Sequence, residues 1–170
     1  MHGCRPDRVW RRARLLPLAA LVAAGALACA KASTPPATDA PQPVAAEDVG
    51  REVRALLAAQ VDAWNRGDVE GFMAGYWRSS ELRFVSGGEV THGWEETLER
   101  YRRTYPDRAT MGTLSFEGID VRTLGEGWAA AHGRYVLERE GDRPTGLFTL
   151  LLERRSEGWR IVHDHTSSGP

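Results

Sequence analysis

The feature that most constrains this chain is a run of four β-strand patterns in its C-terminal third. Apolar and polar residues alternate with a period of two in these patterns, as in strands that turn one face toward a core. The patterns cover residues 111–122, 128–140, 145–155 and 159–167. Short turns containing Gly separate the strands, and strands joined in this way pair antiparallel. The sequence therefore predicts an antiparallel meander.

In the first of these strands the apolar residues change parity partway along. Leu114 and Phe116 share one face, whereas Ile119 and Val121 have the opposite parity. An extra residue in one strand shifts the alternation by one position, so it would bring all four side chains onto the same face. We therefore expect a β-bulge at residues 117–118.

The last strand, residues 158–167, carries the densest set of polar side chains. Strict alternation would put on one face Trp159, Ile161, His163, His165 and Ser167. We expect this face to be concave, which makes His165 the leading candidate for a ligand-contacting or proton-carrying group. Asp164 would point to the opposite face, so the two neighbours would not form an Asp–His dyad.

The segment before the strands is predicted to be mainly helical. Apolar residues recur at helical spacing over residues 49–64, after which Gly67 and Asp68 suit the end of one helix and the start of the next. A short hairpin is expected over residues 82–92 and a third helix over residues 94–105. These elements predict an α+β domain, in which three N-terminal helices pack on a curved antiparallel sheet with a short hairpin.

The N-terminus has the pattern of an export signal. Five arginines lie within the first 14 residues, and the apolar stretch that follows, residues 15–27, is shorter than the about 20 residues of a membrane-spanning helix. The small residues before Cys29 resemble a bacterial lipobox. We therefore expect residues 1–28 to be a lipoprotein-type signal peptide and Cys29 to be lipidated, which would anchor the exported protein to a membrane. Ordinary cleavage and release as a soluble secreted protein is the alternative.

The rest of the chain divides into a predicted tether and a predicted domain. Residues 29–46 are rich in Pro, Ala and Thr, which predicts disorder, and the domain would span residues 47–168. This domain has no cysteine, so it offers no disulfide and no thiol nucleophile. Removal of residues 1–28 takes away five of 22 basic and one of 23 acidic residues, leaving a net charge near −5. An acidic domain without a basic patch argues against binding to nucleic acid.

Three motifs carry a resemblance to a known superfamily. They are WNRGD at residues 64–68, HGW at residues 92–94 and GWRIVHDHTS at residues 158–167. With the order of elements, they resemble the SnoaL-like, nuclear-transport-factor-2-like superfamily over residues 47–168, and the last strand is also similar to the association domain of the calcium/calmodulin-dependent kinase. The resemblance implies a cone-shaped fold with a pocket between helices and sheet, and usually a homodimer across the sheet's outer face.

This superfamily includes steroid isomerases, other enzymes and proteins without catalysis, so the resemblance does not define a reaction. Lining up the turn at residues 67–68 brings the isomerase's oxyanion-hole tyrosine to Gln60 and its general-base aspartate to or near Phe84. An amide is not an acidic phenol, and a phenyl ring takes no proton. Steroid-type isomerisation is therefore disfavoured. A serine hydrolase built on Ser167 is disfavoured too, because the chain has no nucleophile elbow.

We expect aromatic residues of the helices and histidines of the strands to line the pocket. The candidate lining residues are Gln60, Trp64, Trp77, Phe84, Trp94, Tyr101, His132, His163 and His165. Each has a structural alternative, since aromatic residues at helical spacing mostly belong to the core and buried histidines often only complete its hydrogen bonds. No third ligand lies at helpful spacing from the two histidines of the last strand, so we expect neither a metal nor a cofactor.

These observations favour an exported domain that binds an apolar or aromatic small molecule, with no assigned reaction. The first alternative is a SnoaL-like enzyme of isomerase, cyclase or hydrolase type that uses His165 in general acid–base chemistry. The second is an oligomerisation or partner-binding module. All three hypotheses share the same fold, so only the geometry of the pocket can distinguish them.

Overall fold

The computed structural model of the protein describes residues 46–169. The elements in chain order are α1 (Ala46–Asn65), α2 (Val69–Met73), β1 (Arg83–Ser86), β2 (Glu89–His92), α3 (Trp94–Thr104), α4 (Arg108–Met111), β3 (Thr113–Gly125), β4 (Trp128–Glu138), β5 (Thr145–Arg155) and β6 (Gly158–Ser168). The predicted signal peptide, Cys29 and nearly all of the predicted tether lie outside the described residues. No helix between residues 46 and 169 is long and apolar enough to cross a membrane.

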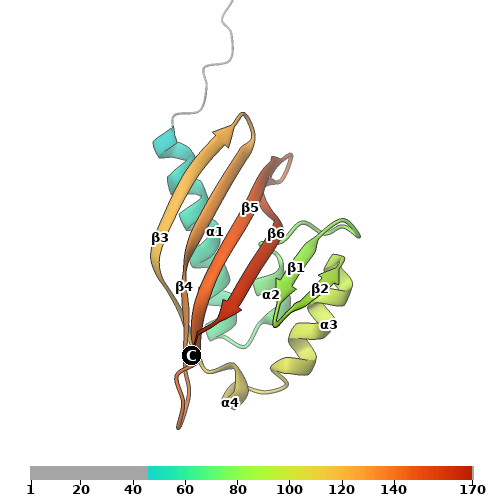
Figure 1. Ribbon diagram of the computed structural model, residues 1–170, viewed down its shortest axis with the longest axis vertical. Coiled ribbons are helices and arrows are strands. Elements are labelled where there is room, and N and C mark those ends of the chain that lie inside the picture. Colours follow the sequence, from blue (N-terminus) through green and yellow to red (C-terminus); the bar gives the residue numbers. More distant parts are fainter. Residues whose placement is uncertain (1–45, 170) are drawn as a thin grey trace, which may run out of the picture. The chain divides into compact units, whose positions relative to one another are not determined.

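The strands form one curved sheet with the order β2-β1-β6-β5-β4-β3. Strands β3 to β6 pair antiparallel in chain order, which confirms the predicted meander. Strand β1 also pairs with β6, and this pair is parallel. The alternation of apolar residues does not predict this pairing. The helices pack on one face of the sheet, called the inner face below, and α1 runs across the strands of the meander (Figure 1).

The turn between α1 and α2 follows from local sequence. Gly67 has a φ of 83°, in the left-handed region that glycine adopts without strain. Asp68 caps α2, and its side chain accepts a hydrogen bond of 2.7 Å from the backbone N–H of Gly71. The two helices therefore meet where the sequence predicts.

The third predicted helix is also present. α3 begins at Trp94, whose indole N–H donates a hydrogen bond of 2.9 Å to the carbonyl of Met73 at the end of α2. Beyond α3, the single turn of α4 was not predicted from periodicity, because its four residues are too few to show a helical pattern. A capping box with Asp107 stabilises this turn.

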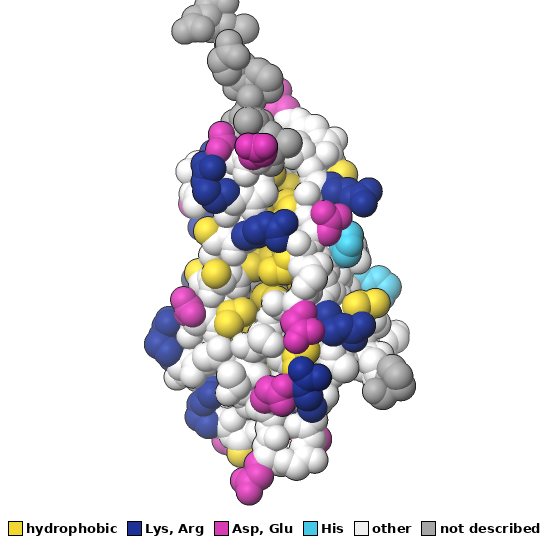
Figure 2. Space-filling model, turned by 90° about the vertical axis from the view of Figure 1, so that its left-hand side faces the viewer, with side chains coloured by type: hydrophobic (Ala, Val, Ile, Leu, Met, Phe, Trp, Pro, Cys, Tyr) yellow, Lys and Arg dark blue, Asp and Glu magenta, His cyan; other side chains and the backbone are white. Residues whose placement is uncertain are grey.

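The hydrophobic core lies between the inner face and the helices. Its largest fully buried side chains come from α1, α2, the segment before β1 and the central strands, and they include Leu57, Met73, Leu82, Leu152 and Ile161. The apolar stripe expected on α1 is part of this core. Figure 2 shows the side of the domain near α1 and β3, where hydrophobic side chains form a band in a shallow hollow and histidine side chains sit at the surface beside it.

A bulge in β3 confirms the one expected from the change of parity. The pairing with β4 shifts between Glu117 and Asp120, and Gly118 within the shift has a φ of 60°. Residues on both sides of the bulge, Phe116 and Val121 among them, therefore pack against the same core.

A second bulge, in β6, was not predicted. The pairing with β5 skips Val162, because His163 and Ile161 are opposite consecutive residues of β5. Ile161 is buried in the core, and beyond the bulge the inward position passes to Asp164. His165 is consequently exposed on the outer face, opposite to the face expected from strict alternation.

Candidate functional site

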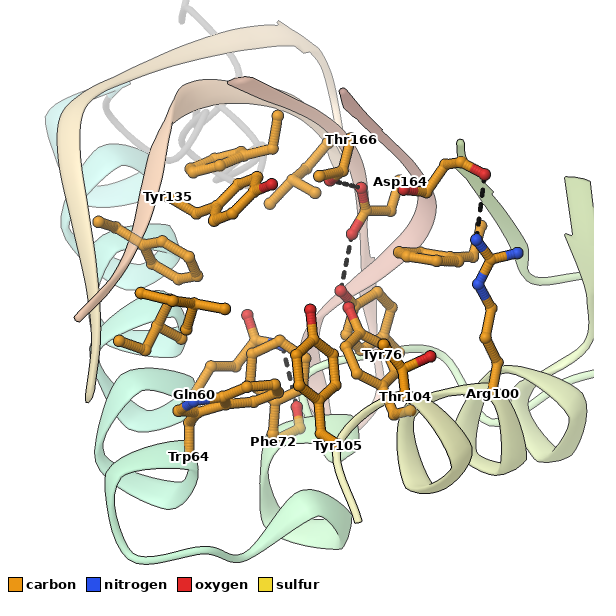
Figure 3. Close-up of a pocket in the computed structure, with 18 of the residues that line it drawn as sticks. Gln60, Trp64, Phe72, Tyr76, Arg100, Thr104, Tyr105, Tyr135, Asp164 and Thr166 are labelled. Atoms are coloured by element: carbon orange, nitrogen blue, oxygen red, sulfur yellow. Dashed lines mark hydrogen bonds between the residues drawn. The ribbon is translucent and has the colours of Figure 1, made fainter. Parts of the chain in front are cut away.

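A cavity of about 320 Å³ lies between the inner face of the sheet and the helices. In Figure 3, Trp64, Phe72 and Tyr105 form one side of an open space, and Tyr135 and Thr166 lie across from them. Side chains from α1, α2, α3, the segment after α2 and five strands contribute to the lining. The cavity is thus built from parts of the chain that are far apart in sequence.

Aromatic rings form much of the cavity wall. The aromatic lining residues are Trp64, Phe72, Tyr76, Phe84, Tyr101, Tyr105, Phe116, Tyr135 and Phe148. Several of them contact one another edge to face, with ring centroids 5.2 Å apart for Trp64 and Phe72, and 4.8 Å apart for Trp64 and Tyr105. Such pairs stabilise a fixed arrangement of rings, so the wall presents a preorganised apolar surface.

Asp164 is the polar centre of the cavity. The residue is only 3% exposed, and its carboxylate accepts two hydrogen bonds of 2.7 Å. The Tyr76 hydroxyl donates to Oδ2, and the Thr166 hydroxyl donates to Oδ1. Both bonds appear as dashed lines in Figure 3. The β6 bulge is what turns this carboxylate toward the helices.

Burial raises the pKa of Asp164 to about 6. Loss of hydration disfavours the charged carboxylate, whereas the hydrogen bonds from Thr166 and Tyr76 favour it and hold the pKa lower than burial alone would. His165, the next residue in the chain, also lowers this pKa through its charge. Asp164 can therefore take up or release a proton near neutral pH.

Two tyrosines beside Asp164 remain protonated. Burial raises the pKa of Tyr76 well above its usual value, and the nearby Asp164 carboxylate raises it further. The pKa of Tyr101 is raised in the same way, by burial of its hydroxyl group and by the charge of Asp164. Both phenols therefore act as hydrogen-bond donors at ordinary pH and do not serve as bases.

Arg100 lines the cavity but has its charge matched elsewhere. Its guanidinium donates to the carboxylate of Glu89 and to the hydroxyl of Thr91, both at 3.2 Å, and to the carbonyl of Ser86 at 3.1 Å. In Figure 3 its head group points away from the open space. Arg100 thus braces the β1–β2 hairpin and leaves Asp164 as the charged group that faces the cavity.

Four of the sequence candidates line the cavity, namely Gln60, Trp64, Phe84 and Tyr101. Gln60 is buried, and its side-chain N–H donates a hydrogen bond of 2.9 Å to the carbonyl of Phe72. Helical spacing pointed to Trp64 and Tyr101, whereas the alignment with the isomerase pointed to Gln60 and Phe84.

The other candidates do not line it. Trp94 is bound in the core by its bond to α2, and Trp77 is half-buried with the guanidinium of Arg155 3.9 Å above its ring. The three remaining candidates are the histidines His132, His163 and His165. They lie on the outer face of the sheet, where strand pairing sets His132 and His165 opposite the same residue of β5.

Sequence reasoning missed Asp164 and its partners Tyr76 and Thr166. Strict alternation put Asp164 and Thr166 on the wrong face of the strand, and Tyr76 was expected only as a buried side chain of the second helix, which in the structure ends at Met73. The available signal was that both faces of the last strand mix apolar and polar residues, which is unusual for a strand with one solvent face. Among residues 46–169, no three acidic, His or Cys side chains converge as a metal site would require.

Comparison with known proteins agrees with this architecture. Residues 53–169 match the model of the SnoaL-like domain. The structure is similar to an NTF-2 like protein of unknown function from Shewanella oneidensis MR-1, with 41% sequence identity and a TM-score of 0.67, over 70% of this chain and 98% of that one. No curated protein matches the chain significantly.

Two more distant structures share the fold alone. A ketosteroid isomerase-like protein from Erwinia carotovora atroseptica SCRI1043 has 19% identity and a TM-score of 0.57, over 71% of this chain and 96% of that one. A putative calcium/calmodulin dependent protein kinase II association domain from Xanthomonas campestris has 19% identity and a TM-score of 0.56, over 71% and 87%. Together with the match to the SnoaL-like domain model, they confirm the resemblance inferred from the sequence motifs. The chain therefore belongs to the SnoaL-like domain family and has an NTF2-like fold.

Proposed function

We propose that this domain binds a compact, largely apolar or aromatic small molecule between its helices and its sheet, with Asp164 contacting the polar part of the ligand. The observation that carries the proposal is a concave aromatic cavity that contains one buried carboxylate. Small-molecule sites commonly combine an apolar lining with a few polar groups that orient the ligand. A volume of about 320 Å³ lies near the lower end for such sites, which favours a compact ligand.

Filling the cavity tests this proposal. Binding of indole, an uncharged aromatic probe, would be measured by NMR on the full chain and on Leu114→Trp. This substitution replaces an aliphatic side chain of the lining, on β3, with a bulkier aromatic one. The matched control is Ser115→Trp, its neighbour on the exposed face of the same strand. We expect Leu114→Trp to abolish indole binding and Ser115→Trp to retain it. Equal binding by all three proteins, each shown to be folded by thermal melting, would contradict the proposal.

A second candidate function is general acid–base catalysis by Asp164. A carboxyl group with a pKa of about 6 in an apolar cavity is suited to proton transfer near neutral pH. The ketosteroid isomerase-like neighbour suggests isomerisation as one reaction of this kind. Gln60 and Phe84, where the isomerase groups are expected, do line the cavity, but neither transfers a proton, so the acid–base group would be Asp164 on a different strand.

An enzyme and a binder differ in what happens to the ligand. Native mass spectrometry of the protein purified from a bacterial host would identify any small molecule carried in the cavity. That molecule would then be incubated with wild type and with Asp164→Asn. Turnover by wild type that is lost in Asp164→Asn would support catalysis. Recovery of the molecule unchanged from both proteins would support binding alone.

The outer face of the sheet supports a proposal of homodimerisation. Its exposed hydrophobic side chains include Trp128 and Leu147, which is 54% exposed. Burial of such side chains against a second copy would stabilise a dimer.

Export and attachment to a membrane through Cys29 belong to the same overall proposal, and they are supported by the sequence pattern of residues 1–29.

A further inference from the structure

We infer that the ligand of this cavity carries a protonated amine on a compact aromatic or apolar body, and that the Asp164 carboxylate binds its ammonium group. The inference rests on the proposed binding function and names a chemical class of ligand for the same cavity. Its basis is the charge, the hydrogen-bonding capacity and the aromatic lining around one buried side chain.

The charge of the cavity is the first step. The charged residues of the lining are Asp164 and Arg100. Arg100 is engaged by Glu89 and by the hairpin, and its head group points away from the open space (Figure 3). The cavity therefore presents a carboxylate without a cationic partner, which favours a cation over an anion as its occupant.

The groups that surround Asp164 leave this charge unmatched. Tyr76 and Tyr101 face it from the helix side, and both are neutral phenols. Its register partners on the flanking strands are apolar, namely Phe84 on β1 and Leu150 on β5. His165 follows it in the chain and lowers its pKa through its charge, but the His165 side chain is exposed on the opposite face of the sheet, outside the cavity.

Hydrogen-bonding capacity points the same way. Each oxygen of Asp164 accepts one bond from the protein, from Tyr76 on Oδ2 and from Thr166 on Oδ1. A carboxylate oxygen has room for about one further donor, so the site requires N–H or O–H groups from its ligand. An ammonium group supplies such donors together with the missing positive charge. An alcohol supplies only a donor, and a carboxylate supplies neither.

The aromatic wall extends the match from the ammonium to the rest of the ligand. The ring of Tyr76, whose hydroxyl donates to Asp164, has its centroid 5.9 Å from that of Phe72. The ring centroids of Phe72 and Tyr101 are 5.2 Å apart. Ring faces attract cations, and aromatic residues around a cation are a recurring solution for binding amines. The same rings offer apolar contact to an aromatic or aliphatic body.

Three probes of one size test the inference. They are 2-phenylethylamine, which carries a positive charge, 2-phenylethanol, which is neutral, and phenylacetate, which carries a negative charge. Affinities would be measured by NMR titration of the full chain at pH 7.5. We expect the amine to bind at least tenfold more tightly than the alcohol, and phenylacetate to bind most weakly.

Two variants show whether Asp164 causes the preference. Asp164→Asn retains the size of the side chain and removes its charge, so we expect the amine to lose at least tenfold in affinity and the alcohol to change less than threefold. His165→Asn, a neighbour on the outer face, serves as the control and should keep the preference of wild type. Equal affinity of wild type for amine and alcohol, or a preference that survives Asp164→Asn, overturns the inference.

The pH dependence gives a second measurement that needs no variant. Asp164 has a pKa of about 6, whereas an alkylamine stays protonated throughout the range from pH 5 to 7.5. A cation binds the ionised carboxylate, so at pH 5 the amine must displace a proton. We therefore expect its affinity to be about tenfold lower at pH 5 than at pH 7.5, with no such change for the alcohol. An amine affinity that does not change with pH overturns the inference.

The outcomes separate this inference from the function on which it rests. If the alcohol or indole binds in the cavity and the amine is not preferred, the domain is still a small-molecule binder and only the amine is excluded. If none of the three probes nor indole binds, both the inference and the proposed binding function are overturned.

Discussion

The hydroxyl of Tyr76 donates a hydrogen bond of 2.7 Å to Asp164 Oδ2, although the two residues are 88 positions apart in the sequence. The bond joins the segment after α2 to the last strand. It also orients the carboxylate that lies in the cavity beside its aromatic wall. The position and the proton affinity of Asp164 therefore depend on the helices as well as on the sheet.

Removing this bond should change the titration of Asp164. The bond from Tyr76 favours the ionised carboxylate, so Tyr76→Phe should raise the pKa of Asp164 above its wild-type value of about 6. An NMR titration that follows the carboxyl carbon of Asp164 would measure the change. Tyr135→Phe, which removes a hydroxyl from another lining residue, is the control. A pKa in Tyr76→Phe at or below that of wild type would be evidence against this account.

The raised pKa of Asp164 should also appear in protein stability. The native carboxyl titrates at about 6 and an unfolded one at about 3.9, so between these values the native state binds more protons. Stability contributed by this group is complete below about pH 4 and is lost as the pH rises through 6. Asp164→Asn lacks this titrating group and does not lose that stability. Its free energy of unfolding should therefore increase relative to that of wild type by about 2 kcal/mol as the pH rises from 4 to 8.

Urea unfolding of wild type and Asp164→Asn at several pH values would check this expectation. His165→Asn is the control variant, because it changes the neighbouring residue of the same strand on the outer face. A stability difference between wild type and Asp164→Asn that stays constant from pH 4 to pH 8 would rule out the proposed burial of charge.

The cap of α2 makes a separate prediction about stability. The Asp68 carboxylate accepts a hydrogen bond from the backbone N–H of Gly71, and loss of such a cap typically costs about 1 kcal/mol. Asp68→Ala should therefore lower the free energy of unfolding by about that amount in urea. Asp62→Ala, an exposed position on α1, should change stability much less. Equal effects of the two substitutions would argue against a capping role.

Homodimerisation across the outer face predicts an effect of Leu147. This side chain is 54% exposed on β5, and a buried carboxylate in its place would oppose association. Sedimentation analysis should show a dimer for wild type and a monomer for Leu147→Glu. Ala58→Glu, at an exposed position on α1 away from the outer face, should remain dimeric. A monomeric wild type would exclude this mode of assembly at the concentrations used.

The prediction that Cys29 is lipidated can be tested by replacing its sulfur atom with oxygen. Cys29→Ser lacks the thiol that would carry the lipid, so the variant should leave the membrane fraction and should lack the lipid mass in mass spectrometry of the mature protein. Wild type expressed in the same host provides the comparison. Membrane association that Cys29→Ser retains at the wild-type level, with no change in mass, would contradict lipidation.

Local patterns were enough to predict most of the fold. Helical spacing predicted α1 and α3, the residues Gly67 and Asp68 predicted the turn between the first helices, and the alternation of the C-terminal strands predicted the meander. The change of parity in β3 even revealed its bulge at Gly118. These features depend on residues close to one another in the chain, which is why they can be recognised without a structure.

The candidate site was predicted only in part, for the same physical reason. Trp64 and Tyr101 lie on regular helices, where spacing determines the face that each residue occupies, and both line the cavity. The parallel pairing of β1 with β6 and the rest of the lining bring together segments far apart in the chain. No local pattern specifies such contacts.

The last strand separates the two kinds of information most clearly. The sequence by itself determined that residues 158–167 form a strand and that Asp164 and His165 lie on opposite faces of it. Only the tertiary structure decided which of them faces the cavity. The pairing of β6 with β5 leaves out Val162, and one skipped residue reverses every later side chain, so Asp164 points toward the helices and His165 toward the outside.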